Sequence, residues 1–241
     1  MGTDMLSDLN PFDLFDREAR RLDAYFAELG AADWDRPSRC KGWTVRDVLA
    51  HLAGEELYNH ACLDDELDVL FNRLDKEGVE GLAGFNQWCV DTRRGLPVAG
   101  VLAEWRRQNG DTRRRMRERG ADAMLPTMAG PYPVGLQTFH YASEYATHAD
   151  DVGAPVADGE EPERSRWRAR VGRFVLAEQG SPVQVEEVPG GVRVRLDGEA
   201  GGTAAKEAEL STSDFVEATV NRLPDDHPLD AQLRAALVCL A

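Results

Sequence analysis

The chain has 241 residues, of which 42% are hydrophobic and 29% are charged, and its formal net charge at pH 7 is −15. This composition is too apolar for a disordered chain, so we expect a folded protein with one large domain, or a main domain and a smaller one. The negative charge argues against non-specific binding to nucleic acid or to anionic lipid.

The beginning of the chain lacks the marks of a targeting sequence. Met1 to Asp8 contain neither a basic start nor an apolar run, and no stretch is apolar over the length of a membrane-spanning helix. We therefore expect a cytoplasmic protein with no membrane partner.

The cysteines are scattered and show no Cys-x-x-Cys spacing. This pattern indicates neither a disulfide framework nor a thiolate zinc site, and we interpret the side chains as ordinary thiols. Cys40 precedes His51 closely enough to keep open a reactive or metal-binding role. The four positions are Cys40, Cys62, Cys89 and Cys239.

Two helices are expected in the first part of the chain. Apolar residues recur at helical spacing from residue 11 to Gly30, where the pattern stops. Thr44 and Asp47 resemble a capping box at the start of a second helix. His51 therefore lies about two turns into that helix.

Two more long helices are expected before Pro155. One lies within residues 85–119, with a break at 95–97 and an end at Gly120, and the other covers residues 135–151. Four long helices in so short a stretch imply an antiparallel four-helix bundle. We assign this domain to residues 1–157.

The composition changes after the bundle, and residues 158–241 are expected to form a small α+β domain. A polar stretch precedes a short helix around 166–179, and alternating apolar residues predict two strands joined by a turn at Pro189 to Gly191. The pattern becomes helical again from 211 to 241. The predicted strands cover residues 183–188 and 192–196.

One segment, residues 106–119, is rich in arginine although the chain as a whole is negatively charged. Acidic residues are interleaved with its arginines, and no aromatic residue follows Trp105 there. These features favour a solvated helix face over a nucleic-acid groove. We expect no nucleic-acid partner.

Glu144 and His148 are candidate metal ligands because residues four apart share one face of a helix. His140 lies on the same face. Positions eight apart are separated by roughly 12 Å along the axis, so His140 and His148 cannot both bind one ion. A further ligand must come from another helix.

His51 is the favoured third ligand, because apolar neighbours place it near the inward face of its helix, whereas His60 has polar neighbours. Two imidazoles and one carboxylate suit a divalent metal of the zinc class and leave a coordination position open. The alternative is a core histidine satisfied by Glu55 or a backbone carbonyl, with Glu144 and His148 forming a surface pair. Spacing alone leaves both interpretations open.

Three segments carry a resemblance to a known family: Gly42 to Leu52, the pair Phe85 and Asn86, and Glu144 to Gly153. Together they resemble the DinB-like metal-binding family, specifically its mycothiol-dependent maleylpyruvate isomerase branch. The tail is similar to the small sterol-carrier-like domain that follows the bundle in that branch. The resemblance covers the whole chain.

The resemblance implies a zinc site at His51, Glu144 and His148, and a functional arginine at Arg222 in the tail. It also implies mycothiol as a thiol cosubstrate. The thiol would add to the cis double bond of a maleylpyruvate-like acid, allow rotation and leave again, while Arg222 could hold a substrate carboxylate. A surface role for Arg222 stays open.

Two alternatives to this function remain. The activated thiol could attack another small electrophile and stay attached, which would make the protein a thiol transferase. The second alternative is a non-catalytic module that binds a metal or ligand. A fourth protein ligand from His60, Cys40 or elsewhere would favour this alternative, because structural zinc sites are normally closed by four ligands.

Overall fold

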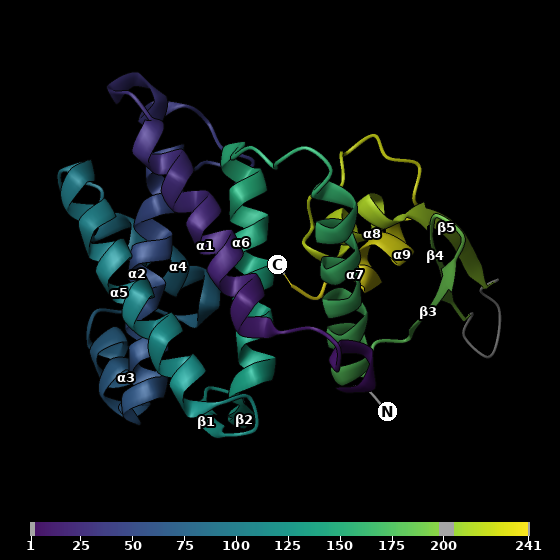
Figure 1. Cartoon of the computed structure of the whole chain (residues 1–241), viewed down its shortest axis with the longest axis horizontal. Helices are drawn as coiled ribbons and strands as arrows, with labels where there is room; N and C mark the ends of the chain where they lie inside the picture. The colour runs from purple at the N-terminus through teal and green to yellow at the C-terminus, as the bar shows by residue number, and fades with distance from the viewer. Residues whose placement is uncertain (1–2, 198–204, 241) are drawn as a thin grey trace. The chain divides into compact units, whose positions relative to one another are not determined.

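A computed structural model of the chain describes residues 3–197 and 205–240 (Figure 1). The chain divides into two compact units, Pro11–Pro155 and a second unit made of Met1–Asn10 with Val156–Ala241. The first ten residues, expected to belong to the bundle, group with the C-terminal unit.

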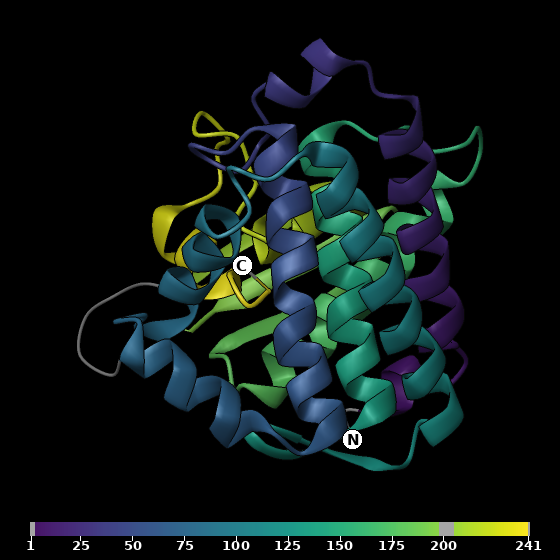
Figure 2. The ribbon, with the colours of Figure 1, turned by 90° about the vertical axis from the view of Figure 1, so that its left-hand side faces the viewer.

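The unit Pro11–Pro155 is helical. Its four long helices, α1, α2, α5 and α6, lie side by side (Figures 1 and 2), as the sequence predicted for a bundle. The elements are α1 (Pro11–Glu28), the 3-10 helix η2 (Ala31–Asp35), α2 (Val45–Asp64), α3 (Leu67–Lys76), α4 (Gly81–Asp91), α5 (Val98–Arg119), β1 (Met124–Thr127), β2 (Gly130–Pro133) and α6 (Val134–Val152).

The break expected at residues 95–97 and the end expected at Gly120 are both present: Pro97 precedes α5 and separates it from α4, and α5 ends at Arg119. Two other features differ from the expectation. The short amphipathic helix α3 was not predicted. Residues 124–133 form the antiparallel hairpin β1–β2, which was not predicted.

Helix α2 is the centre of the helical unit and is buried around most of its circumference. It begins as predicted: Thr44 Oγ1 accepts a hydrogen bond from the backbone N–H of Asp47, and the Asp47 carboxylate accepts one from the backbone N–H of Thr44. Gly54 lets α4 approach closely, because a Cβ there would lie 2.3 Å from Cys89 Cβ.

Helix α6 packs against α1 and α2 with small side chains. Ala142, Ala146 and Ala149 are completely buried, and their size allows close helix packing. The helix follows Pro133 and ends at Gly153, whose φ of 76° lies in the left-handed region that glycine adopts at helix ends. Glu144 lies near the middle of this helix, and His148 lies one turn further toward its C-terminus.

The C-terminal unit combines helices with a three-stranded antiparallel sheet of order β3-β4-β5. Apolar residues of β4, including Val192 and Val194, form its core with Phe215 of α8. The strands β3 and β4 were predicted, whereas β5 was not. The elements are α7 (Glu161–Glu178), β3 (Val183–Val188), β4 (Gly191–Leu196), β5 (Lys206–Ser211), α8 (Thr212–Thr219) and α9 (Ala231–Leu237).

The beginning of the chain contributes the 3-10 helix η1 (Thr3–Leu6) to the C-terminal unit, where it contacts α7. Leu6 is buried. Arg170 of α7 donates a hydrogen bond to the carbonyl of Met5 at 2.8 Å and pairs with Asp8. These contacts explain why the first ten residues group with α7 and not with the bundle.

The arginines of the basic segment pair with carboxylates inside the helical unit. Arg117 pairs with Asp13 at 2.9 Å and Arg106 with Asp23 at 2.6 Å, both on α1. Arg115 pairs with Asp64 at the end of α2. These three side chains therefore form ion pairs between helices, whereas Arg114 pairs with Asp111 and Glu118 within α5.

Across the described parts of the chain, every helix is too short or too polar to cross a membrane.

Candidate metal centre

The structure brings His51, Glu144 and His148 together, although α2 and α6 are far apart in sequence. One donor atom from each of the three lies within 4.8 Å of the other two. Nε2 of His51 is 3.3 Å from Oε1 of Glu144, and Nε2 of His148 is 4.0 Å from the same oxygen. Both imidazoles therefore direct Nε2 toward one carboxylate.

The two histidines are buried, whereas the side chain of Glu144 is 35% exposed. Glu144 therefore forms the side of the cluster that solvent can reach. This differs from the alternative in which Glu144 and His148 form a surface pair, because His148 is an interior residue.

Glu55, one turn after His51 on α2, approaches the same nitrogen of His51 as Glu144 does. Its Oε2 is 3.4 Å from His51 Nε2, and its Oε1 is buried without a hydrogen-bond partner in the described structure. Burial, reinforced by the negative charge of Glu144, raises the pKa of Glu55 well above its usual range. The Glu55 partner considered in the sequence analysis is thus present, together with Glu144.

The protonation of the two imidazoles differs. Burial lowers the pKa of His51, which favours the neutral ring that can bind a cation. Burial acts the same way on His148, but hydrogen bonds with Asp151 and Cys40 outweigh it and raise the pKa to about 10. A cation at His148 Nε2 must displace a proton.

Glu144 is held in its ionised form. Partial burial disfavours the carboxylate, but the hydrogen bond with His51 and the positive charge of His148 outweigh it and lower the pKa of Glu144 to about 2. Its charge is therefore available at neutral pH.

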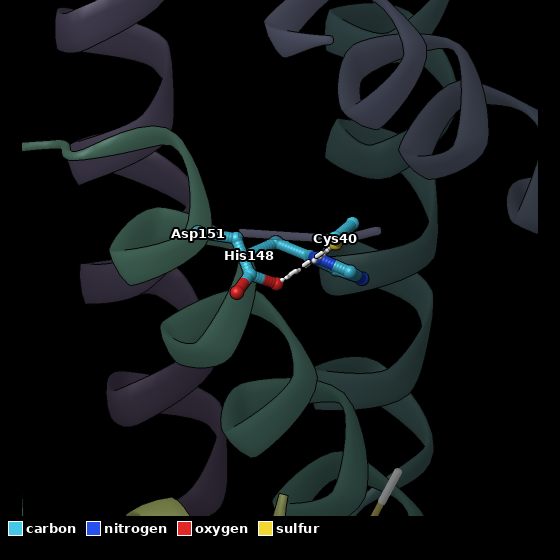
Figure 3. A group of neighbouring side chains, drawn as sticks. All are labelled: Cys40, His148 and Asp151. Carbon is cyan, nitrogen blue, oxygen red and sulfur yellow. Dashed lines mark hydrogen bonds and ion pairs between the residues drawn. The ribbon is translucent and has the colours of Figure 1, made fainter. Parts of the chain in front are cut away.

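The far side of the His148 ring contacts a second buried group (Figure 3). Asp151 Oδ2 lies 3.1 Å from His148 Nδ1, and the Cys40 thiol donates to the same oxygen at 3.0 Å. Cys40 Sγ is 3.7 Å from Nδ1. Cys40 thus faces Nδ1 and not Nε2, so it cannot close the coordination of an ion held by Nε2.

The donor set at His51, Glu144 and His148 fits a divalent cation of the zinc class. Bonds of 2.0 to 2.2 Å to a tetrahedral ion would place donors about 3.3 to 3.6 Å apart, close to the observed 3.3 and 4.0 Å. The unpartnered Glu55 oxygen beside them marks a polar environment that the protein leaves unsatisfied.

The other histidines of the helical unit lie elsewhere. His60 Nε2 is 3.3 Å from the carbonyl of Gln108 on α5, and His140 Nε2 is 3.3 Å from the Tyr132 hydroxyl. Neither belongs to the metal-ligand groups found in the described structure. The preference for His51 over His60 agrees with this geometry.

Arg222 belongs to the C-terminal unit and follows Asn221, which has a positive φ of 55°. Its Nη1 donates to the carbonyl of Val220 at 3.1 Å. The side chain is partly buried.

Asp151 was missed as a site residue. Its signal was present, since a carboxylate three residues after His148 lies on the same helix face. From the sequence, Cys40 could be placed only near the site, because it precedes His51 closely. Its contact with Asp151 could not be predicted, since that contact depends on how the loop before α2 folds onto α6.

The N-terminal part of the chain matches a family model. Residues 15–153 match the mycothiol maleylpyruvate isomerase N-terminal domain, which includes all three candidate ligands. No curated protein matches the chain.

Two solved structures are similar to this one. The crystal structure of the mycothiol-dependent maleylpyruvate isomerase is 17% identical, with a TM-score of 0.60 and coverage of 89% of each chain. A mutant of that enzyme with a histidine replaced by alanine is 16% identical, with a TM-score of 0.59 and coverage of 88% of each chain. At these identities the similarity shows the fold. Because the family match spans more than half of the 241 residues, the chain belongs to the mycothiol maleylpyruvate isomerase N-terminal domain family.

Proposed function

We propose that this protein is a metal-dependent enzyme that uses mycothiol to isomerise a maleylpyruvate-like cis-enoic acid. The main support is the convergence of two imidazole Nε2 atoms on one ionised carboxylate inside a bundle of this family. His51, Glu144 and His148 would hold the cation. When bound there, a divalent cation would stabilise the thiolate form of a nearby thiol and so make it a better nucleophile at neutral pH.

The protein's own residues support this role in different ways. The neutral His51 and the ionised Glu144 offer donors without a change of protonation at neutral pH. Glu144 also compensates charge, since one carboxylate reduces the charge of a divalent cation to about +1. The exposed side of Glu144 is where a small thiol and a small electrophile could enter.

The number of protein ligands favours catalysis over a purely structural site. Three donors converge, and Cys40, considered as a fourth ligand, faces the opposite nitrogen of His148. Glu55 also lies beside the centre, with Oε2 3.4 Å from His51 Nε2, but its raised pKa favours the neutral carboxylic acid, and a carboxyl group binds a metal in its deprotonated form. A tetrahedral ion held by three protein groups keeps one position for a small molecule.

The experiment compares wild type with His51→Ala and with His60→Ala as a matched control on the same helix. We expect bound zinc and mycothiol affinity to be lost in His51→Ala and kept in His60→Ala, because His60 contacts α5 and lies outside the cluster. Full zinc occupancy and unchanged thiol affinity in His51→Ala would show that the site assignment is wrong.

Thiol transfer to another electrophile is the second candidate, because the same ligands would serve both reactions. The two are separated by incubating the protein with mycothiol and the candidate substrates, and measuring the product mass. Isomerisation predicts a product with the mass of the substrate and full recovery of thiol. A product heavier by the thiol would identify a transferase.

Arg222 is proposed to bind a substrate carboxylate, which a guanidinium can hold by two parallel hydrogen bonds. We expect Arg222→Ala to raise KM about tenfold or more, with zinc content unchanged, since a charged hydrogen bond contributes roughly 1.5 to 3 kcal/mol. Arg222→Lys should recover only part of this effect. Unchanged KM in both variants would assign Arg222 to the surface.

A further inference from the structure

The Nδ1 side of His148 contains a compact buried group that the proposed reaction does not use (Figure 3). Asp151 is 3% exposed, and its Oδ2 meets both His148 Nδ1 at 3.1 Å and the Cys40 thiol at 3.0 Å. Cys40 and His148 are buried as well. One carboxylate oxygen therefore serves two neighbouring donors.

The group joins two segments of the helical unit. His148 and Asp151 lie on α6, whereas Cys40 lies in the loop between η2 and α2. That loop is fixed to α6 through its backbone, since the N–H of Arg39 donates to the carbonyl of Asp151 at 2.9 Å. The position of the Asp151 carboxylate is thus held by its helix and by the loop.

The same loop reaches the other imidazole. The Trp43 ring centroid lies 5.2 Å from that of His51, and Ser38 Oγ donates to the Trp43 carbonyl at 2.8 Å. Ser38 Oγ also accepts a hydrogen bond from the N–H of Cys40 at 3.2 Å. Residues 38–43 therefore contact the surroundings of both histidines of the candidate centre.

An imidazole presents a lone pair at Nε2 only when its proton is on Nδ1. A carboxylate beside Nδ1 selects that tautomer, orients the ring and makes Nε2 a stronger donor. The distances at Asp151 match this arrangement, and the S–H of Cys40 is the right donor to keep the carboxylate in place, because the thiol needs an acceptor when buried.

We propose that Asp151 is a positioning residue of the metal centre, which holds the Nδ1–H of His148 so that Nε2 faces the cation, and that Cys40 anchors Asp151. This inference rests on the proposed function. A bound cation at Cys40, His148 and Asp151 themselves is the alternative use of the same group, since their donor atoms also lie within 4.8 Å of one another.

The test measures zinc affinity of the full-length protein by competition with a chelator, together with the visible absorption spectrum of the cobalt-substituted protein. We expect Asp151→Asn, which keeps the shape but loses the charge, and Asp151→Ala to weaken zinc binding by about 10- to 100-fold. The cobalt spectrum should shift in both, because the ligand field at His148 changes. Asp150→Asn removes the same charge from the neighbouring residue and should change neither.

Cys40 variants separate anchoring from a general effect on folding. Cys40→Ser keeps a donor of similar size and should bind zinc nearly as wild type, whereas Cys40→Ala should weaken binding by a few-fold. Urea unfolding of each metal-free variant reports folding independently. If Asp151→Ala does not fold, Asp151→Asn and Cys40→Ala still decide the outcome.

Three results would overturn the proposal. Zinc affinity and cobalt spectra equal to wild type in Asp151→Asn and Cys40→Ala would remove the positioning role while leaving the proposed function intact. Two zinc ions per chain, one of them lost in Cys40→Ala, would identify a second cation site instead. Wild type without zinc affinity, or His51→Ala with full affinity, would overturn both the positioning role and the proposed function.

Discussion

Two neighbouring glutamates of α2, Glu55 and Glu56, are both buried but differ in how completely their carboxylates are hydrogen-bonded. Glu56, 1% exposed, accepts four hydrogen bonds, from Asn59, Asn109, Thr112 and Tyr145 at 2.5 to 3.1 Å. Glu55, 7% exposed, keeps one oxygen with no hydrogen-bond partner in the described structure and faces His51.

This difference separates a structural cluster from a functional one. The Glu56 network joins α2, α5 and α6, and Trp105 Nε1 completes it by donating to the Tyr145 hydroxyl at 3.0 Å. Every donor meets an acceptor there, which is the condition under which a buried polar group stabilises a fold. Around His51, by contrast, Glu55 Oε1 has no hydrogen-bond partner in the described structure. A buried polar atom without a partner is expected where a ligand or ion binds.

The largest effect on stability is expected at Glu56. Glu56→Ala leaves the donors of Asn109, Thr112 and Tyr145 without an acceptor and opens a cavity, so the free energy of unfolding should fall by about 3 kcal/mol or more. Urea unfolding measures this loss. Zinc affinity of the folded variant should stay within a few-fold of wild type. A loss of affinity as large as that of His51→Ala would contradict the assignment of a purely structural role to the Glu56 network.

Zinc should stabilise the folded protein by binding at the cluster of His51, Glu144 and His148. Zinc at 100 times its Kd should raise the unfolding free energy of wild type by about 2.7 kcal/mol, since a ligand that binds only the folded state stabilises it. His148→Ala should abolish this increase, whereas His140→Ala, on the same helix but bound to Tyr132, should keep it. Thermal unfolding with zinc and with a chelator provides the measurement.

A smaller effect, dependent on pH, is expected from Glu55 in the metal-free protein. Its pKa is raised on folding by burial and by Glu144, so its contribution to stability is full at low pH and is lost as pH rises through the folded-state pKa. Glu55→Gln should therefore be stabilised relative to wild type increasingly as pH rises. Glu28→Gln, at an exposed position of α1, is the control.

Unfolding free energies at several pH values, with a chelator present, test this prediction. A difference between Glu55→Gln and wild type that stays constant with pH would mean that Glu55 does not change its protonation on folding.

The helices of the bundle and the positions of the candidate ligands on them could largely be predicted from the sequence, because they follow from local periodicity. Glu144 and His148 are four residues apart, and that spacing alone places them on one helix face. The capping box at Thr44 and Asp47 also depends only on adjacent residues, and it set the position of His51 within α2.

The polar interior was not accessible in the same way. Glu55 could be placed beside His51, because residues four apart share a helix face, but nothing in the pattern of α2 predicted that Glu56 would also be buried. Helix α2 is surrounded on nearly all sides, so both side chains are interior. Strand β5 was missed because its residues 206–211 alternate weakly and gain their pairing only from β4. The metal role of His51, Glu144 and His148, and the role of Arg222, stay predictions.

The grouping of Met1–Asn10 with Val156–Ala241 means that the helical unit is inserted into the sequence of the other one. A single cut near residue 155 would therefore not separate two intact domains. A fragment starting at Val156 would lack the carbonyl of Met5 and the carboxylate of Asp8 that Arg170 binds, and would expose the apolar surface that Leu6 covers. Excision of Pro11–Pro155 with a short linker in its place would preserve both ends of the host domain.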